Sequence, residues 1–246
     1  MSNPSYVALA AGLALFAVAQ PADAASVFVA NHSFEADKLG DGQFRNGYAP
    51  SGWSSGYAEP SGPANPLAGD FNEAVPDGEN VMFSATGYDG SPYYQGNVFQ
   101  QVLDGVAANT RYTLMVDIGR ATYIDMADFA VQLVGGSDLT SVFASGSFLS
   151  DDIASGEFRT LTLTFDTAAA FEGPFGIRLR TFHNPAQGQG QRVTYFDNVR
   201  LDASPLATAA VPEPSSWALM ILGAGLSGAA LRRSAVRQRL AGSPVA

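Results

Sequence analysis

The sequence predicts an all-β domain built from two packed antiparallel sheets, and three observations support this prediction. Several segments alternate apolar and polar residues with a period of two, which is typical of strands with one buried face. Turn-forming Gly, Asn, Asp and Pro residues separate these segments. No amphipathic helix of useful length occurs between residues 26 and 202, so packing two sheets together is the natural way to bury the apolar faces.

Composition excludes several classes of function. The chain has 246 residues, 46% of them hydrophobic and 15% charged, which is enough to build a substantial core. Its net charge of −10 argues against nucleic-acid binding, because that affinity comes mostly from Lys and Arg on phosphates. The absence of cysteine excludes disulfides, thiolate metal sites and cysteine nucleophiles, and two histidines, His32 and His183, are too few for a three-histidine metal site.

The N-terminus predicts export. Residues 7–19 form an uncharged apolar run that is short for a membrane span. Ala22 and Ala24 fit the −3 and −1 positions of a signal-peptidase site, so residues 1–24 are predicted to be a signal peptide. No Lys or Arg precedes the apolar run, which departs from the usual pattern, and a buried helix of a cytosolic domain is the alternative.

Five segments of the body show one apolar face each. We expect these faces to be buried: Tyr112, Leu114, Val116 and Ile118; Phe129, Val131 and Leu133; Leu161, Leu163 and Phe165; Phe175, Ile177 and Leu179; Val193, Tyr195, Val199 and Leu201. Residues 40–79 differ, because they are rich in Gly, Pro and Ser with scattered aromatic residues. Such a stretch is either functional or folded into short irregular strands.

The C-terminus predicts a membrane anchor. Residues 203–210 are a linker of small residues, and Pro212 and Pro214 make the next segment an extended peptide, because proline ends helices and strands. Residues 215–231 carry no charge over 17 residues, which is the lower limit for a transmembrane helix. The arginines that follow place the tail in the cytoplasm and the body outside.

The order of these C-terminal features resembles a known sorting signal. Val211-Pro212-Glu213-Pro214, then the apolar span, then Arg232-Arg233 is similar to the PEP-CTERM signal of exopolysaccharide-producing Gram-negative bacteria. For residues 211–246 the resemblance implies recognition by an exosortase, transient anchoring in the inner membrane and removal of the anchor, after signal peptidase has acted at the other end. A plain C-terminal membrane anchor is the alternative.

The body resembles a second family. Asn31-His32-Ser33-Phe34-Glu35, Ser51-Gly52-Trp53 and Phe196-Asp197-Asn198 are similar to motifs of galactose-binding-like domains, which include carbohydrate-binding modules. The resemblance implies an antiparallel jelly-roll β-sandwich over residues 25–202.

Asp197 is the most informative acidic residue. It shares strand parity with Tyr195, Val199 and Leu201, so we expect it to point inward, where an unpartnered carboxylate is too costly. The resemblance implies a structural Ca²⁺ held by Glu35 and Asp197, with backbone carbonyls completing the oxygen shell. The alternatives are backbone N–H donors at a bulge or an arginine partner.

Aromatic residues in the loops are candidates for sugar binding. Trp53, Tyr57, Tyr93 and Tyr94 could stack on the C–H faces of sugars while nearby amides and acids bond the hydroxyl groups. For Trp53 the alternative is packing beneath the long loop.

Motifs of hydrolytic enzymes are missing. No Gly-x-Ser-x-Gly elbow occurs, and the many acids suggest an acidic surface rather than a catalytic pair. The sequence therefore predicts an exported cell-surface or matrix protein with a noncatalytic carbohydrate-binding module, associated with exopolysaccharide or biofilm. A purely structural protein and a polysaccharide hydrolase are the alternatives. Acids outnumber bases 21 to 9 in residues 26–210, which favours a neutral glycan.

Overall fold

The computed structural model describes residues 24–57, 60–86, 95–184, 186, 190–206, 218, 220–228 and 232. Contacts divide the chain into two units, Met1–Leu206 and Ala207–Ala246. The first unit holds all the described strands, and the second holds helical residues at 220–228.

The predicted export and sorting segments lie largely outside the described residues. This applies to Ala22, to Val211, Pro212, Glu213 and Pro214, and to Arg233, whereas Ala24 is exposed just before the first strand. The predicted span at 215–231 is described only in part. None of the helices in the described part of the chain has the length and apolar character needed to cross a membrane.

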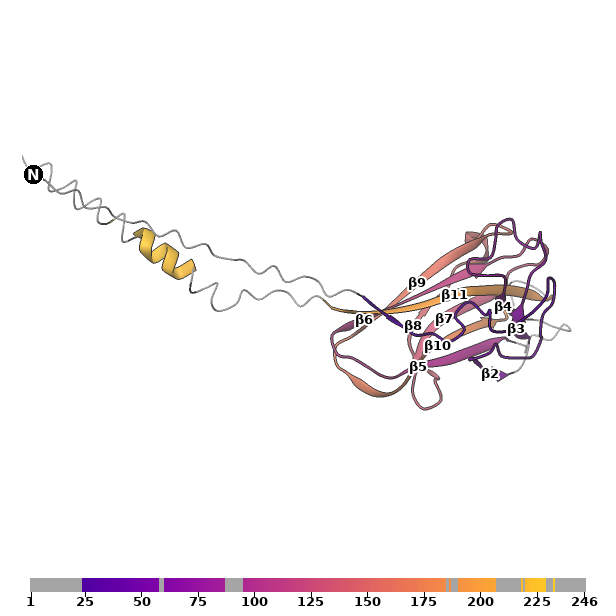
Figure 1. Cartoon of the computed structure of the whole chain (residues 1–246), viewed down its shortest axis with the longest axis horizontal. Helices are drawn as coiled ribbons and strands as arrows, with labels where there is room; N and C mark the ends of the chain where they lie inside the picture. The colour runs from indigo at the N-terminus through magenta and orange to yellow at the C-terminus, as the bar shows by residue number, and fades with distance from the viewer. Residues whose placement is uncertain are drawn as a thin grey trace, which may run out of the picture. The chain divides into compact units, whose positions relative to one another are not determined.

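The body is an antiparallel β-sandwich, as predicted (Figure 1). The first sheet has the order β3 (Ser61–Ala64), β4 (Val81–Thr86), β11 (Arg192–Pro205), β6 (Thr110–Gly119) and β9 (Phe158–Thr167), and β1 (Ala25–Val27) also pairs with β11. The second sheet has the order β2 (Ser54–Tyr57), β5 (Asn97–Val106), β10 (Phe171–Phe182), β7 (Asp128–Gly135) and β8 (Ser141–Gly146). A short 3₁₀ helix, η2, spans Ser150–Asp152.

The main core lies between the two sheets and confirms four of the five predicted faces. The apolar residues of β6, β7, β9 and β10 that share a parity belong to this core or pack against it. Burying these faces is the main favourable term in the folding of such a sandwich.

A second core covers the other face of the first sheet. Phe71, from the irregular stretch 40–79, packs there on Phe158 and Tyr195, with ring centroids 4.5 and 5.3 Å apart. The same stretch supplies the short strands β2 and β3, as expected for a long irregular segment in a compact domain. The part of the first sheet formed by β3, β4 and the first half of β11 is therefore buried on both faces.

A β-bulge in β11 corrects the predicted parity of the fifth face. Asp197 pairs with Asp117 of β6, but the next pair joins Arg200 to Met115, so β11 carries one extra residue, and Asn198 has φ of 50°. The extra residue inverts the alternation. Val199 and Leu201 reach the core between the sheets with Phe196, whereas Tyr195 and Val193 lie on the outer face. The prediction that Tyr195, Asp197, Val199 and Leu201 point the same way is wrong.

The predicted linker also begins too early. Ala203 to Pro205 continue β11, because they pair with Tyr112, Arg111 and Thr110 of β6. Small residues suit a strand end as well as a linker, so composition alone does not separate the two.

Candidate functional site

A cavity of about 400 Å³ opens on the outer face of the first sheet. Its floor comes from β3, β4 and β11, and its walls come from the irregular stretch and from the segment after β6. The lining is mainly apolar and aromatic: Gly42, Gln43, Phe44, Ala64, Asn65, Pro66, Leu67, Asp70, Phe83, Tyr123, Ile124, Gln191, Val193 and Tyr195. Such a lining with a few polar groups is typical of a small-molecule site.

Two tyrosines of the cavity lining contact one another through their hydroxyl groups. The hydroxyl oxygens of Tyr123 and Tyr195 lie 2.6 Å apart and share a hydrogen bond. Tyr195 is buried, whereas Tyr123 is exposed at the mouth. Burial raises the pKa of Tyr195, and the hydrogen bond with Tyr123 and the negative charge of Asp70 raise it further. Tyr195 therefore keeps its proton and offers a permanent O–H group inside an apolar cavity.

Aromatic rings shape the cavity mouth. Phe44 meets Phe83 edge to face with ring centroids 5.9 Å apart, a favoured arrangement for aromatic pairs. Phe44 itself remains 65% exposed, and Leu67 and Tyr123 are exposed beside the same opening. The mouth therefore presents apolar surface that a bound molecule could cover.

Sequence reasoning missed this cavity. Its floor contains Tyr195, which the parity argument placed in the core between the sheets. Its walls come from a segment that joins the sheet through β3 and the bridge between Phe44 and Ala64. The aromatic residues scattered through residues 40–79 were the available signal, but they did not indicate which face they cover.

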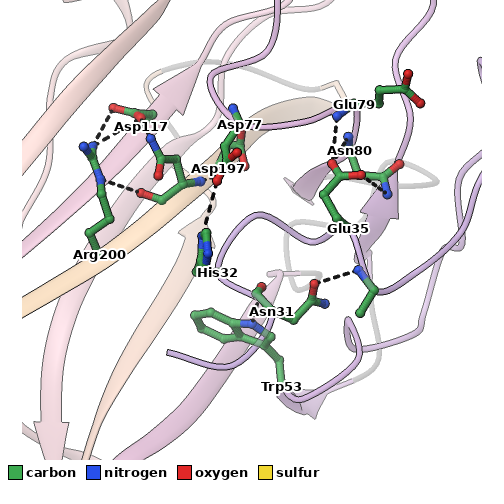
Figure 2. A network of polar contacts seen from close by, with 12 residues as sticks. Asn31, His32, Glu35, Trp53, Asp77, Glu79, Asn80, Asp117, Asp197 and Arg200 are labelled. Carbon is green, nitrogen blue, oxygen red and sulfur yellow. Dashed lines mark hydrogen bonds and ion pairs between the residues drawn. The ribbon is translucent and has the colours of Figure 1, made fainter. Parts of the chain in front are cut away.

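Asp197 lies at the bulge, beneath the loop that carries Asp77 (Figure 2). Its carboxylate accepts N–H bonds from Asp77 and Asn198 at 2.9 and 2.6 Å. Burial raises the pKa of Asp197 to about 8, and the charges of Asp77 and Asp117 add to this rise, while the two N–H donors oppose it. This arrangement agrees with the alternative in which backbone N–H groups at a bulge, rather than calcium, hold Asp197.

Asp117, beside Asp197, has partners of its own. It accepts hydrogen bonds from Thr160 and from the Asn198 side chain, and it forms an ion pair with Arg200 at 3.3 Å. The arginine of this cluster therefore neutralises Asp117, and Asp197 depends on N–H donors alone.

Glu35 is held separately from Asp197 (Figure 2). Its carboxylate accepts backbone N–H bonds from Glu79 and Asn80 at 2.8 and 2.6 Å. In the described part of the chain no group of three or more acidic or histidine side chains could hold a metal ion. The residues present satisfy each carboxylate without a cation, so calcium binding by Glu35 and Asp197 stays a prediction.

Of the predicted sugar-stacking residues, Trp53 is the one whose side chain the structure describes. Trp53 is 6% exposed, packs against Phe34, and donates its indole N–H to the carbonyl of Asn31. It therefore has the packing role that was the alternative. Tyr57 lies at the end of β2, and Tyr93 and Tyr94 lie outside the described residues.

Solved structures of cyclases share the fold of the body. An apo cyclase from Fischerella sp. is 23% identical with a TM-score of 0.61, covering 75% of this chain and 98% of its own. A Stig cyclase, Fisc from Fischerella sp. TAU, in complex with (3Z)-3-(1-methyl-2-pyrrolidinylidene)-3H-indole, is 24% identical with the same TM-score, covering 75% and 100%. A carbohydrate-binding module, CBM4, is 15% identical with a TM-score of 0.40, covering 63% and 96%.

The sorting signal is confirmed. A model of the PEP-CTERM protein-sorting motif matches residues 210–234. The chain is therefore an exosortase substrate that is exported and transiently held at the membrane. No curated protein matches the chain.

A second family model decides the class of the body. The HpiC1-like model, described as HpiC1 cyclase, matches residues 25–202, which is more than half of the chain. Cyclases are enzymes, so the prediction that the body is noncatalytic is wrong. That prediction rested on missing hydrolase motifs, whereas a cavity assembled from distant segments leaves no linear motif. The chain belongs to the HpiC1-like family of cyclases.

Proposed function

We propose that the body is an exported enzyme that binds a small, largely aromatic molecule in the outer-face cavity and closes a ring within it. The observation that carries the proposal is the hydrogen-bonded Tyr123–Tyr195 pair in the lining of a mainly apolar cavity. The family match supports the reaction type.

A ring closure within one molecule is an isomerisation, so it needs no external oxidant or reductant. It needs a folded substrate, which apolar walls provide by holding the reacting atoms close together. It is also helped by a hydrogen-bond donor aimed at negative charge that develops on the substrate, and Tyr195 retains its O–H group for this because burial raises its pKa. Asp70, which lines the same cavity, would stabilise positive charge that develops on the substrate.

The ligand of the Stig cyclase structure has the chemistry that this cavity accepts. It combines an aromatic indole with a nitrogen-containing ring. Phe44, Phe83 and Tyr123 offer ring faces and edges, and Asp70 offers a carboxylate for a basic nitrogen. We propose a substrate of this general class for the present chain.

Calorimetric titration of the full chain in detergent with (3Z)-3-(1-methyl-2-pyrrolidinylidene)-3H-indole tests the binding step. We expect saturable heat that Phe83→Ala weakens at least several-fold. Tyr195→Phe keeps the shape of the cavity, so it should retain binding but lose turnover of an open-chain precursor. Tyr48→Phe, an exposed tyrosine outside the lining, is the matched control. No heat with the unaltered chain would contradict the proposal.

We also propose that the processed protein resides at the cell surface or in the extracellular matrix, near exopolysaccharide. The sorting motif supports this location. Intact-mass measurement on protein from the native host should show that residues 1–24 and the C-terminal span are both removed. A mature form that retains Arg232 and Arg233 in exosortase-competent cells would contradict the processing.

A further inference from the structure

Two arginines lie side by side on the outer face of the second sheet, on the opposite side of the sandwich from the cavity. Arg178 and Arg180 alternate along β10 with Ile177 and Leu179, whose side chains belong to the core between the sheets. Both arginines therefore point away from that core. Two residues along a strand correspond to roughly 7 Å, so the two positive charges are close neighbours.

These arginines differ from most others in having no carboxylate partner. Five arginines of the body form ion pairs with aspartates: Arg45, Arg111, Arg120, Arg192 and Arg200. Arg178 and Arg180 instead donate to side-chain amide oxygens, those of Gln132 at 2.8 Å and Gln95 at 3.1 Å. Among the described residues, no carboxylate reaches salt-bridge distance of either guanidinium.

The pair is held in place at an electrostatic cost. Burial lowers the pKa of Arg178, and the neighbouring charge of Arg180 lowers it further. Asp138 lies near enough for its charge to oppose this fall in the pKa of Arg178, but it does not come within ion-pair distance in the described part of the chain. Only the Nε group of Arg178 is engaged by Gln132, which leaves both Nη groups as donors.

Side chains of the neighbouring strands lie in register with Arg178 and form a row across the sheet. Phe99 of β5 and Gln132 of β7 lie opposite Arg178 on either side, and Ser145 of β8 lies opposite Gln132. The Gln132 amide also donates to the Ser145 hydroxyl at 3.2 Å. A half-buried aromatic ring, a guanidinium, a buried amide and an exposed hydroxyl therefore follow one another across the sheet.

We infer that this face binds a carboxylated polysaccharide, with the carboxylates on Arg178 and Arg180. A guanidinium matches a carboxylate with two parallel hydrogen bonds, which are stronger than bonds between neutral groups. The buried Gln132 amide orients the Arg178 guanidinium, the exposed Ser145 hydroxyl suits a sugar hydroxyl, and the Phe99 ring suits the C–H face of a sugar.

The position of β10 argues against an acidic peptide as the ligand. Both edges of β10 are already paired, with β5 on one side and β7 on the other. A peptide cannot add to this strand as a further strand, so recognition must come from side chains alone. A polymer that repeats carboxylates and hydroxyls along its length uses such a row better.

Binding of alginate, a polymer of uronic acids, to the purified full chain in detergent tests the inference. We expect the double variant Arg178→Gln/Arg180→Gln to bind alginate about tenfold more weakly or worse, because two charge-assisted contacts are lost. The double variant Arg111→Gln/Arg159→Gln removes the same charge from the first sheet and should change the affinity less than about twofold. Binding should also weaken with added salt.

Four outcomes would overturn the inference: equal binding of neutral dextran, equal loss in the two double variants, tighter binding of polyglutamate than of alginate, or no alginate binding by the unaltered chain. A change in molecular mass of the Arg178→Gln/Arg180→Gln variant by light scattering would instead identify the face as a contact between copies. The site is separate from the cavity, so its failure leaves the cyclase proposal standing, and titration with the indole compound distinguishes the two.

Discussion

The two outer faces of the sandwich differ in how far the rest of the chain covers them. On the first sheet, residues 40–79 cover β4 and β11, so Val81, Phe83 and Tyr195 are buried behind the main core. On the second sheet, half-buried Arg178, Arg180 and Phe99 occupy the corresponding face. Covering a sheet face makes a dry, shaped cavity in which a single hydroxyl can act, whereas a less covered face keeps its charges available to a partner.

Residues 40–79 form a cover over β4 and β11, and weakening this cover should have the largest effect on the contrast. Phe71→Ala empties a buried ring position against Phe158 and Tyr195, and we expect a loss of about 3–4 kcal/mol in the free energy of unfolding. Binding of the indole compound should fall as well. Denaturant unfolding and calorimetry measure the two effects.

Phe44→Ala is the control for this change, because Phe44 lines the same cavity but is 65% exposed. Its stability should change by less than about 1 kcal/mol. Similar stability losses in both variants would show that the cover does not behave as a second core.

A smaller effect is expected where the cover closes over Glu35. Gly78 has φ of 83°, and a Cβ atom there would clash with the Glu35 carboxylate. Gly78→Ala should therefore destabilise by about 2 kcal/mol, through backbone strain and the clash together. Gly69→Ala is matched, since Gly69 also has positive φ, at 100°, but has open space around its Cβ position. Thermal unfolding should give a clearly smaller loss for Gly69→Ala, and equal losses would remove the clash from the explanation.

A further prediction concerns the pH dependence of stability and rests on Asp197. Its pKa is about 8 in the folded protein, against about 3.9 in an unfolded chain, so the folded state binds the proton more tightly. The cost of the ionised form is present above pH 8 and is relieved as the pH falls from about 8 to about 4. The unaltered chain should therefore gain stability relative to Asp197→Asn by up to about 1.4 kcal/mol per pH unit over that window.

Asp166→Asn provides a control of opposite sign. Arg111 lowers the pKa of Asp166 through a hydrogen bond and an ion pair, so the contribution of this carboxylate is lost as the pH falls through its folded value. Urea unfolding at a series of pH values measures both differences. A difference between the unaltered chain and Asp197→Asn that stays flat from pH 8 to pH 4 would contradict the raised pKa.

Asp197→Asn also tests calcium binding by Glu35 and Asp197. If Glu35 and Asp197 hold the ion, a hundredfold excess over Kd stabilises the fold by about 2.7 kcal/mol, and Asp197→Asn removes that gain. Equal melting temperatures with Ca²⁺ and with a chelator would leave Asp197 as an acid held by the N–H groups of Asp77 and Asn198.

The sequence by itself determined the strands that bury one face and the sorting signal. Alternation identified β6, β7, β9 and β10, because each has one face in the core between the sheets, and a period of two reports that arrangement directly. The PEP-CTERM signal was readable because its parts follow one another along the chain.

Tertiary structure alone decided the position of Tyr195 and the existence of the cavity. The extra residue at Asn198 inverts the parity of β11. The alternation within one strand does not reveal such a bulge, because a bulge is defined by pairing with the neighbouring strand. The cover over β4 and β11 comes from residues more than a hundred positions away from Tyr195, so its contact with that face depends on the folded chain.

For charge, too, the sequence determines the total, whereas the tertiary structure decides which charges are neighbours. The net charge of −10 led to the prediction of a neutral ligand, but a sum over the chain does not say which charges lie together. Five arginines form ion pairs with aspartates, whereas Arg178 and Arg180 form none with the residues that the structure describes. That separation is set by strand order and register, since these decide which side chains become neighbours across a sheet.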